Sequence, residues 1–205
     1  MRSDEYNWDI YPKTYAAQVV QVKKRRTLSI NRGDFKIVDG VICLKDGLLP
    51  LPPNHKLLYE EIIDLAPTSV HEVGCGWGNS LANINILTVG GISVYGSEIS
   101  QKQIDGAETR HPWLKKYITL NDITKSPVTA CDIVFTAAVL MHLSDSNLEK
   151  AIKNIAASAK QHILLVENPR RHYPTVFFCV GPEGWEDAKV KEVERDGGQI
   201  TIISR

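Results

Sequence analysis

The chain has 205 residues, enough for one sizeable domain, and its 43% hydrophobic and 23% charged residues are ordinary for a globular protein. Lys plus Arg and Asp plus Glu number 24 each, so the formal net charge is zero. That balance disfavours DNA or long RNA as the main partner. The polar N-terminus argues against a secretory signal, and no apolar run approaches the roughly 18 residues of a membrane-spanning helix.

Four cysteines are spread along the chain without any pair at metal-ligand spacing. They are Cys43, Cys75, Cys131 and Cys179. Free thiols in apolar surroundings behave as small hydrophobic groups, and they persist in reducing compartments. We therefore expect no metal site and a cytoplasmic location.

Residues 1–65 are predicted to form a small cap that does not fold independently, placed on a core of residues 66–205. Within the cap, Asp39-Gly40 suits a type I′ turn, and Asn54 is expected to cap the helix that follows it. The predicted elements of the cap are a helix over Thr14–Val22, a β-hairpin over Phe35–Leu44 and a helix over His55–Leu65.

From residue 69 onward, apolar strand patterns alternate with helical patterns. The predicted strands are Val70–Val73, Ile92–Ser97, Lys116–Leu120, Asp132–Thr136 and His162–Val166, followed by a strand pair at Ala188–Glu194 and Gln199–Ser204. The predicted helices are Asn79–Thr88, Gln101–Arg110 and Asn147–Ala159. This order predicts an α/β, Rossmann-like open sheet that is mostly parallel, with an antiparallel C-terminal hairpin and the small N-terminal helical and hairpin cap.

A glycine-rich turn follows the first core strand, in the stretch VHEVGCGWGN over residues 70–79. Ligands of such sheets bind beyond the carboxyl ends of the strands, and glycines let them approach the backbone closely. Glu98 lies 20 residues after Gly78, at the end of the next strand, where its carboxylate can accept hydrogen bonds from ribose hydroxyls. The pattern predicts a cofactor that contains a nucleoside.

The turn favours a cationic cofactor over a dinucleotide. The dinucleotide pattern G-x-G-x-x-G requires a third glycine where this chain has Asn79. Glu72, two residues before the turn, would repel a pyrophosphate and attract a cation. S-adenosylmethionine carries a sulfonium and an ammonium group and no phosphate, so it fits this charge.

Over roughly residues 69–205 the chain resembles the class I S-adenosylmethionine-dependent methyltransferases. The matching segments, in the expected order, are HEVGCGWGNSL (71–81), VYGSEIS (94–100), NDIT (121–124) and CDIVFTAAVLMHL (131–143). The resemblance implies S-adenosylhomocysteine as the product cofactor. It also implies the following cofactor contacts: Glu72, Gly74, Cys75 and Gly76 around the methionine part, Glu98 on the ribose, Ile99, Asp122 and Ile123 around the adenine, and Ala137 beside the amino group and sulfur.

Two of these residues have a second interpretation. Asp122 can instead cap a turn before Ile123, and Glu72 can order the glycine turn through its backbone amides. Cys75 is expected to act through its backbone rather than its thiol.

Methyl transfer needs a base only where the acceptor holds a proton. His142 suits a base for a hydroxyl acceptor, although it can also simply shape the pocket. Glu167, at the end of the fifth strand, is the second catalytic candidate. Residues proposed to contact the acceptor are Tyr11, Tyr15, His55, Arg170 and His172. The first three can alternatively close over the cofactor.

The sequence therefore predicts transfer of a methyl group to a small-molecule acceptor, with oxygen favoured and nitrogen and carbon left open. One alternative is a tRNA or protein methyltransferase that uses the basic segments 23–26 and 170–171. The ordinary interpretation of segment 23–26 is a group of cations at a helix C-terminus, and that of segment 170–171 is a solvated loop. Another alternative is a non-catalytic subunit that binds S-adenosylmethionine. The oligomeric state is left open.

Overall fold

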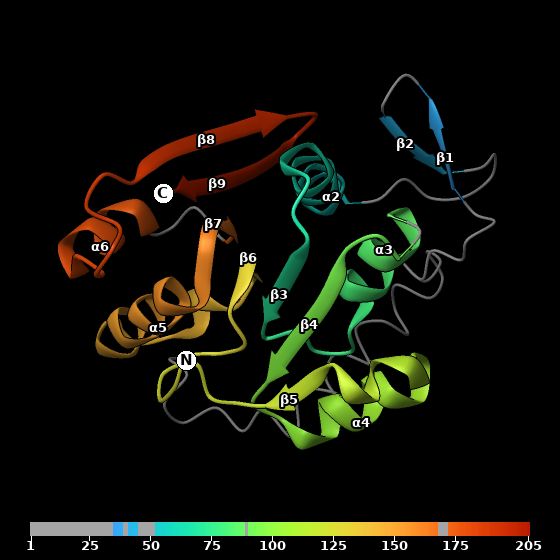
Figure 1. Ribbon diagram of the computed structural model, residues 1–205, viewed down its shortest axis with the longest axis horizontal. Helices are drawn as coiled ribbons and strands as arrows, with labels where there is room; N and C mark the ends of the chain where they lie inside the picture. The colour runs from blue at the N-terminus through green and yellow to red at the C-terminus, as the bar shows by residue number, and fades with distance from the viewer. Residues whose placement is uncertain (1–34, 39–40, 45–51, 89, 168–171) are drawn as a thin grey trace.

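The structure is a computed structural model that describes residues 35–38, 41–44, 52–88, 90–167 and 172–205 (Figure 1). Predictions for Thr14–Val22, the basic segment 23–26 and the Asp39-Gly40 turn lie outside these residues. A two-stranded antiparallel sheet pairs β1 (Phe35–Val38) with β2 (Val41–Leu44), as the predicted hairpin requires.

A seven-stranded sheet forms the centre of the molecule, in the order β5-β4-β3-β6-β7-β9-β8. Its first five strands in this order are parallel, and β9 is antiparallel to both β7 and β8. The predicted fold is therefore confirmed. The strands are β3 (Ser69–Val73), β4 (Ser93–Glu98), β5 (Ile118–Leu120), β6 (Cys131–Ala137), β7 (Ala159–Val166), β8 (Lys189–Arg195) and β9 (Gly198–Ser204).

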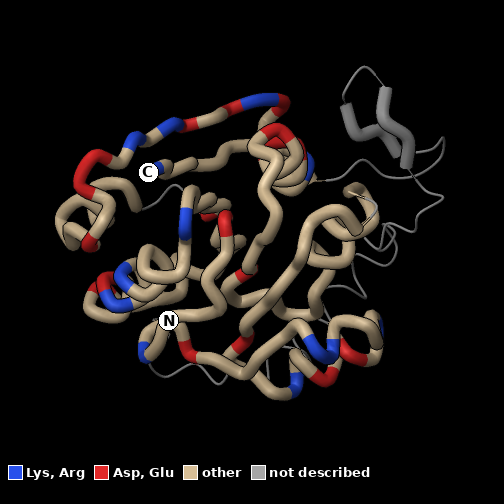
Figure 2. The backbone as a smooth tube through the Cα atoms, viewed as in Figure 1, with Lys and Arg blue, Asp and Glu red and all other residues tan. Residues whose placement is uncertain are grey.

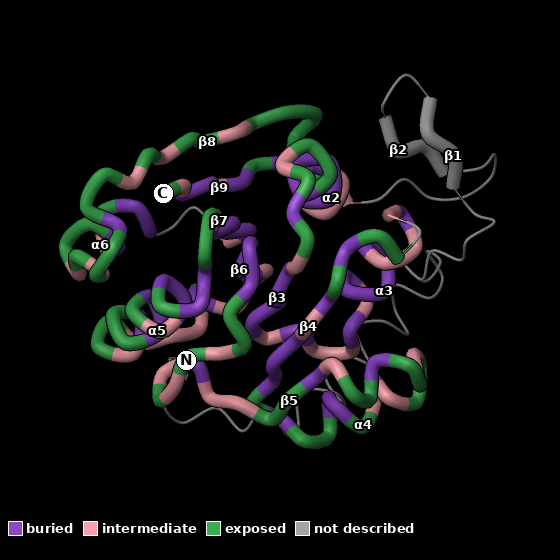
Figure 3. The backbone as a smooth tube through the Cα atoms, viewed as in Figure 1, coloured by how far each residue is buried: buried purple, intermediate pink, exposed green. Residues whose placement is uncertain are grey.

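Helices cover both faces of this sheet, because successive side chains of a strand point to opposite faces. In β7, Leu164 belongs to the core layer that includes residues of α2 (Pro53–Leu65), α3 (Asn79–Leu87) and α4 (Gln101–Arg110), whereas Ile163 belongs to the layer that includes residues of α5 (Asp145–Ser158) and α6 (Tyr173–Val180). Figure 3 shows the resulting burial of β3, β6, β7 and β9. The sheet therefore lies between two packed layers of helices.

The outer strands of the sheet are short or charged. β5 has three residues, and β8 carries both basic and acidic side chains along an exposed edge, at Lys189, Lys191, Glu192, Glu194 and Arg195 (Figures 2 and 3). Such features discourage pairing with the edge of another chain. In the part of the chain that is described, no helix is both long enough and apolar enough to cross a membrane.

Two local predictions differ from the structure. Asn54 lies inside the first turn of α2, which begins after Pro52, and its side chain accepts a hydrogen bond from the Gln199 amide instead of capping the helix. Helix α6 is also absent from the predicted elements. The pattern YPTVFFCV is rich in β-branched and aromatic residues, which have low helix propensity. The helix forms because Phe177 and Tyr173 pack in the core.

Candidate active site

The glycine turn between β3 and α3 forms one wall of a cavity at the carboxyl edge of the sheet. Gly74, Gly76 and Gly78 have φ angles of 69°, 52° and 71°, a region that L side chains rarely adopt. A Cβ at Gly74 would lie 2.5 Å from Val139 Cγ2, in the loop after β6. The absence of a side chain therefore lets the two loops cross closely.

The cavity has a volume of about 300 Å³, the low end of the range for small-molecule sites. It joins the glycine turn, the end of β4, the loop after β6 and the first turn of α2. Its lining residues are His55, Glu72, Gly74, Cys75, Gly76, Trp77, Asn79, Ser80, Glu98, Ile99, Gln103, Ala137, Ala138, Val139 and His142.

The buried residue Glu72 is one of the residues that line this cavity. Its side chain is 3% exposed, and Oε2 is buried without a hydrogen-bond partner. Burial raises the pKa of Glu72 to about 8, against a hydrogen bond with Ser80 and with a smaller contribution from Glu98. A buried acid with an unused oxygen is suited to a cationic group of a ligand.

Glu98 organises the turn from the neighbouring strand. One carboxylate oxygen accepts a hydrogen bond from the Gly76 amide at 2.9 Å, and the other accepts from the amides of Ile99 and Ser100 at 2.9 and 3.1 Å. Burial raises the pKa of this carboxyl, while the three amides favour its charged form. Glu98 thus connects the glycine turn to the start of α4.

The loop after β6 brings His142 to the opposite side of the cavity. Ala138 has a φ angle of 56°, an uncommon conformation for a residue with a side chain. His142 then ends a short 3₁₀ helix, η3 (Leu140–His142). Burial lowers the pKa of its imidazole, and a hydrogen bond with the Ala138 backbone opposes this shift. The imidazole is therefore suited to accept a proton at neutral pH.

Glu167 ties this loop to the end of β7 and does not line the cavity. Its Oε1 accepts a hydrogen bond from the Val139 amide at 2.9 Å, and its Oε2 accepts from the Met141 amide at 3.1 Å. Burial raises the pKa of this carboxyl, while these and neighbouring hydrogen bonds oppose the shift. Both oxygens are engaged in holding the loop that carries His142.

The structure separates two of the predicted adenine contacts from the described lining. Asp122 Oδ1 accepts hydrogen bonds from the amide and hydroxyl of Thr124, and Oδ2 pairs with Lys125 at 3.1 Å. This is the turn that the second interpretation of Asp122 describes. Ile123 is 7% exposed and packs in the core beside α5. By contrast, Ile99 is 46% exposed and lines the cavity.

Several lining residues lack an obvious sequence signal. Asn79, Ser80 and Gln103 belong to the first turns of α3 and α4, and Val139 follows the strained Ala138. Only the rule that helix N-termini approach the ligand edge of such a sheet would have indicated the first three. Trp77 packs beside Gly106 of α4, and the Arg110 guanidinium lies 3.9 Å from the indole centroid. Part of the Trp77 indole therefore packs against α4.

The proposed acceptor contacts are divided by the structure. His55 lines the same cavity as Glu72 and His142. His172 lines a separate cavity with Glu167, and its Nδ1 lies 2.7 Å from Thr175 Oγ1 at the start of α6. The remaining three, Tyr11, Tyr15 and Arg170, lie outside the described residues.

In the described part of the chain, no group of three or more His, Cys, Asp or Glu side chains is arranged to hold a metal ion. The described cysteines are free: Cys75 and Cys131 are buried, and Cys179 is exposed. Cys75 N donates to the Ser97 carbonyl and Cys75 O accepts from the Gly78 amide, so its backbone shapes the turn.

Comparison with known proteins connects this site with a family. Residues 70–162 match a family model described as "Methyltransferase domain". A sequence search of curated proteins found no match. Magnesium protoporphyrin IX methyltransferase from Synechocystis PCC 6803, solved with S-adenosylmethionine, is 20% identical, with a TM-score of 0.55 over 74% of this chain and 77% of its own. A second structure of that enzyme holds S-adenosylhomocysteine.

Two other solved structures share the fold. A TehB-like S-adenosylmethionine-dependent methyltransferase from Corynebacterium glutamicum is 15% identical, with a TM-score of 0.60 over 95% of this chain and 97% of its own. Human N-acetylserotonin methyltransferase is 16% identical, with a TM-score of 0.54 over 74% of this chain and 54% of its own. Residues 70–162 therefore match a methyltransferase domain, and the chain shares its fold with S-adenosylmethionine-dependent methyltransferases.

Proposed function

We propose that the chain methylates a small-molecule acceptor, most readily at oxygen, and that the cavity of Glu72, Glu98 and His142 holds the cofactor and borders the acceptor. The main observation behind this proposal is that His142 and the buried acid Glu72 line one cavity. Glu72 as the proposed partner of a cationic group and His142 as the proposed proton acceptor thus lie at the same edge of the sheet.

The residues of the cavity fit S-adenosylmethionine. In this proposal the unpartnered oxygen of Glu72 takes a cationic group, Glu98 takes the ribose, and exposed Ile99 gives an apolar surface to the adenine, and all three residues line the cavity. The glycine turn leaves the backbone open to close approach. The cofactor supplies a methyl group on a positively charged sulfur.

The protein's own part in the reaction is alignment and proton removal. Loop 137–142 would hold the acceptor beside the cavity, and His142 would accept the proton that an acceptor hydroxyl releases when it is methylated. Glu167 keeps this loop in place through the amides of Val139 and Met141. A small acceptor also agrees with the neighbours named for small molecules, such as magnesium protoporphyrin IX and N-acetylserotonin.

The test combines cofactor binding with a screen for turnover. S-adenosylhomocysteine should raise the melting temperature of the wild-type protein, and Glu98→Ala should abolish the shift, because the ribose contact and three backbone hydrogen bonds are lost. Asp105→Ala on exposed α4 is the matched control and should retain the shift. Radiolabelled methyl transfer should then be measured to a phenol, a carboxylic acid, an amine, bulk tRNA and a protein extract.

Label in the phenol or the acid supports the proposal. Label only in the amine moves the acceptor to nitrogen, and label only in tRNA or protein favours the macromolecular alternative. Cofactor binding with no label anywhere favours the non-catalytic subunit. A wild-type protein that binds no S-adenosylhomocysteine would contradict the cofactor site itself.

A further inference from the structure

The amino-acid end of the cofactor carries a carboxylate as well as an ammonium group, and the cavity offers few partners for it. Its described lining includes the acids Glu72 and Glu98 but no Lys or Arg. The basic side chains there are the imidazoles of His55 and His142, and burial lowers the pKa of both, so they offer N–H donors rather than charges. This inference rests on the proposed cofactor site.

His55 carries hydrogen-bonding capacity that the protein does not use. Its Nδ1 is buried and has no partner among the described residues, although buried polar atoms are normally paired. One turn later on the same helix, Tyr59 lies behind the ring, with 6.3 Å between ring centroids. The Tyr59 hydroxyl accepts a hydrogen bond from Asn83 of α3 at 3.0 Å. His55 and Glu72 line this cavity from different elements, α2 and β3.

The turn between β8 and β9 holds the residues on both sides of His55. Asn54 Oδ1 accepts a hydrogen bond from the Gln199 amide at 3.0 Å. Lys56 Nζ pairs with Asp196 Oδ2 at 2.8 Å. A Cβ at Gly198 would lie 2.6 Å from the Pro53 carbonyl oxygen, so the backbone of β9 lies directly against the first turn of α2.

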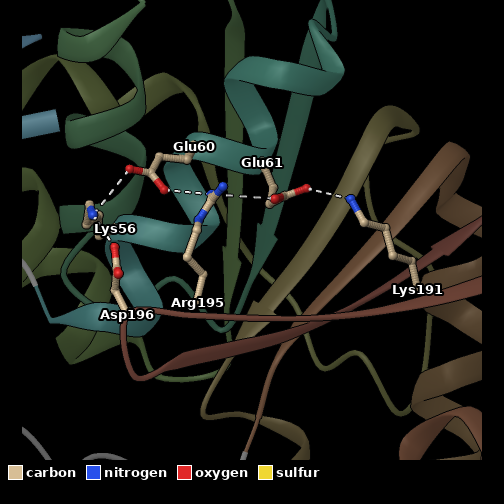
Figure 4. Close-up of polar contacts among 6 residues, drawn as sticks. All are labelled: Lys56, Glu60, Glu61, Lys191, Arg195 and Asp196. Atoms are coloured by element: carbon tan, nitrogen blue, oxygen red, sulfur yellow. Dashed lines mark hydrogen bonds and ion pairs between the residues drawn. The ribbon is translucent and has the colours of Figure 1, made fainter. Parts of the chain in front are cut away.

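Further ion pairs continue this attachment along the helix. Arg195 pairs with Glu60 at 2.8 Å, and Lys191 pairs with Glu61 at 3.5 Å. Figure 4 shows these pairs together with Lys56 and Asp196, all between α2 and the C-terminal hairpin. The contacts at residues 53, 54 and 56 are the ones that bracket His55, whereas the Glu61 pair lies more than one turn further along.

We propose that His55 binds the carboxylate of the cofactor's amino-acid end, and that the turn over residues 196–199 positions it for this contact through Asn54 and Lys56. An imidazole N–H donates to the carboxylate while Glu72 faces the ammonium group. The two charged groups on one α-carbon are then held by side chains from α2 and β3. Asn54 and Asp196 are positioning residues, because they act on the cofactor only through His55.

The test compares two ligands that differ in the amino-acid end. Titration calorimetry should be carried out with S-adenosylhomocysteine, which has the carboxylate, and with 5′-methylthioadenosine, which lacks the whole amino-acid end. A hydrogen bond to a charged group makes His55→Ala weaken S-adenosylhomocysteine binding by about tenfold, while 5′-methylthioadenosine binding stays within about twofold. His142→Ala should leave the preference between the two ligands unchanged.

The positioning role has its own variants. Asn54→Ala should show the same selective loss to a smaller degree, and Asn54→Asp should restore binding because it keeps the accepting oxygen. In a His55→Ala background, Asn54→Ala should cause no further loss, which separates positioning from general destabilisation. Lys191→Ala is the matched control, since it breaks an ion pair of the same helix and hairpin away from His55 and should alter neither affinity.

The proposal would be overturned if His55→Ala weakened the binding of both ligands equally or of neither. It would also be overturned if the selective loss of S-adenosylhomocysteine binding appeared in His142→Ala instead. Additive losses for Asn54→Ala and His55→Ala would contradict the positioning role. If the wild-type protein binds neither nucleoside, the proposed cofactor site itself is wrong. If it binds both and His55→Ala is not selective, only this inference is wrong.

Discussion

The proposed contact of Glu72 with a cationic cofactor would make cofactor binding depend on a proton. Its pKa of about 8 means that the carboxyl is mostly protonated at neutral pH, before any cation is present. A cationic ligand favours the carboxylate, so the proton must leave when the ligand binds. Groups near this acid include Glu98 and Tyr59, and burial raises the pKa of the Tyr59 hydroxyl to about 12, so neither supplies a positive charge.

We expect the wild-type protein to release about one proton on binding S-adenosylhomocysteine at neutral pH, and affinity to rise with pH until Glu72 is ionised. Calorimetry in two buffers with different ionisation enthalpies measures that number. The ligand's own α-amino group is also ionisable, so Glu72→Gln serves as the control that retains only the ligand's contribution. Equal proton release by wild type and Glu72→Gln would show that Glu72 is ionised before the ligand arrives.

His142 gives a second prediction at the residue scale. As a general base it must be neutral to act, so turnover should fall as the pH drops through its lowered pKa and should level off above it. His142→Ala should reduce kcat by about a hundredfold and leave the dissociation constant of S-adenosylhomocysteine within about twofold. Unchanged kcat would mean that the imidazole only shapes the cavity.

Residues that act through backbone geometry were the easiest to predict from the sequence. The glycines of the turn and Glu98 occupy fixed spacings, and the structure places Gly74, Gly76 and Glu98 around one cavity. Asp122 is different, because its neighbours Thr124 and Lys125 satisfy its carboxylate locally. Sequence spacing does not show whether a short acidic side chain will satisfy its own turn or a ligand.

At the scale of elements, the loop between β6 and η3 depends on the end of β7. Glu167→Gln replaces one accepting oxygen with a donor that faces a backbone amide, so the free energy of unfolding should fall by about 1–3 kcal/mol. Because Val139 lies against Gly74 and lines the cavity, S-adenosylhomocysteine binding should weaken as well. Urea unfolding and calorimetry measure the two effects.

Glu149→Gln, on the exposed side of α5, is the matched control and should change neither quantity. A Glu167→Gln variant that unfolds and binds the cofactor like wild type but loses turnover would instead support the role as a base that the sequence suggested. Its carboxyl would then act on the acceptor rather than on the loop.

Most elements were predictable because the sheet is covered on both faces, which makes its strands nearly continuous in apolar residues. Helix α2 was also predicted, but the attachment of its first turn was not. That attachment uses Asn54 and Gln199, which are 145 residues apart, and nothing local in the sequence connects them. The same holds for Glu167 and Val139, which meet only because β6 and β7 are neighbours.

At the scale of the whole molecule, two adjacent residues of β3 oppose each other in their effect on stability. His71 is fully buried, neither ring nitrogen has a partner among the described residues, and burial lowers its pKa from 6.5 to about 4. The next residue, Glu72, has its pKa raised from 4.5 to about 8. His71 therefore destabilises the fold as the pH falls below 6.5, and Glu72 destabilises it as the pH rises above 4.5.

Each group alone changes the free energy of unfolding by about 1.4 kcal/mol per pH unit within its window. The two slopes cancel between pH 4.5 and 6.5, and only the loss due to Glu72 remains from 6.5 to about 8. Urea unfolding of the ligand-free protein should show that, relative to wild type, Glu72→Gln gains stability up to about pH 8 and His71→Leu gains it below pH 6.5. Saturating S-adenosylhomocysteine should remove the loss above pH 6.5, because a cation beside Glu72 stabilises the carboxylate that burial disfavours. A difference between wild type and Glu72→Gln that does not vary with pH would show that the acid is ionised throughout, and the link between cofactor charge and fold stability would be lost.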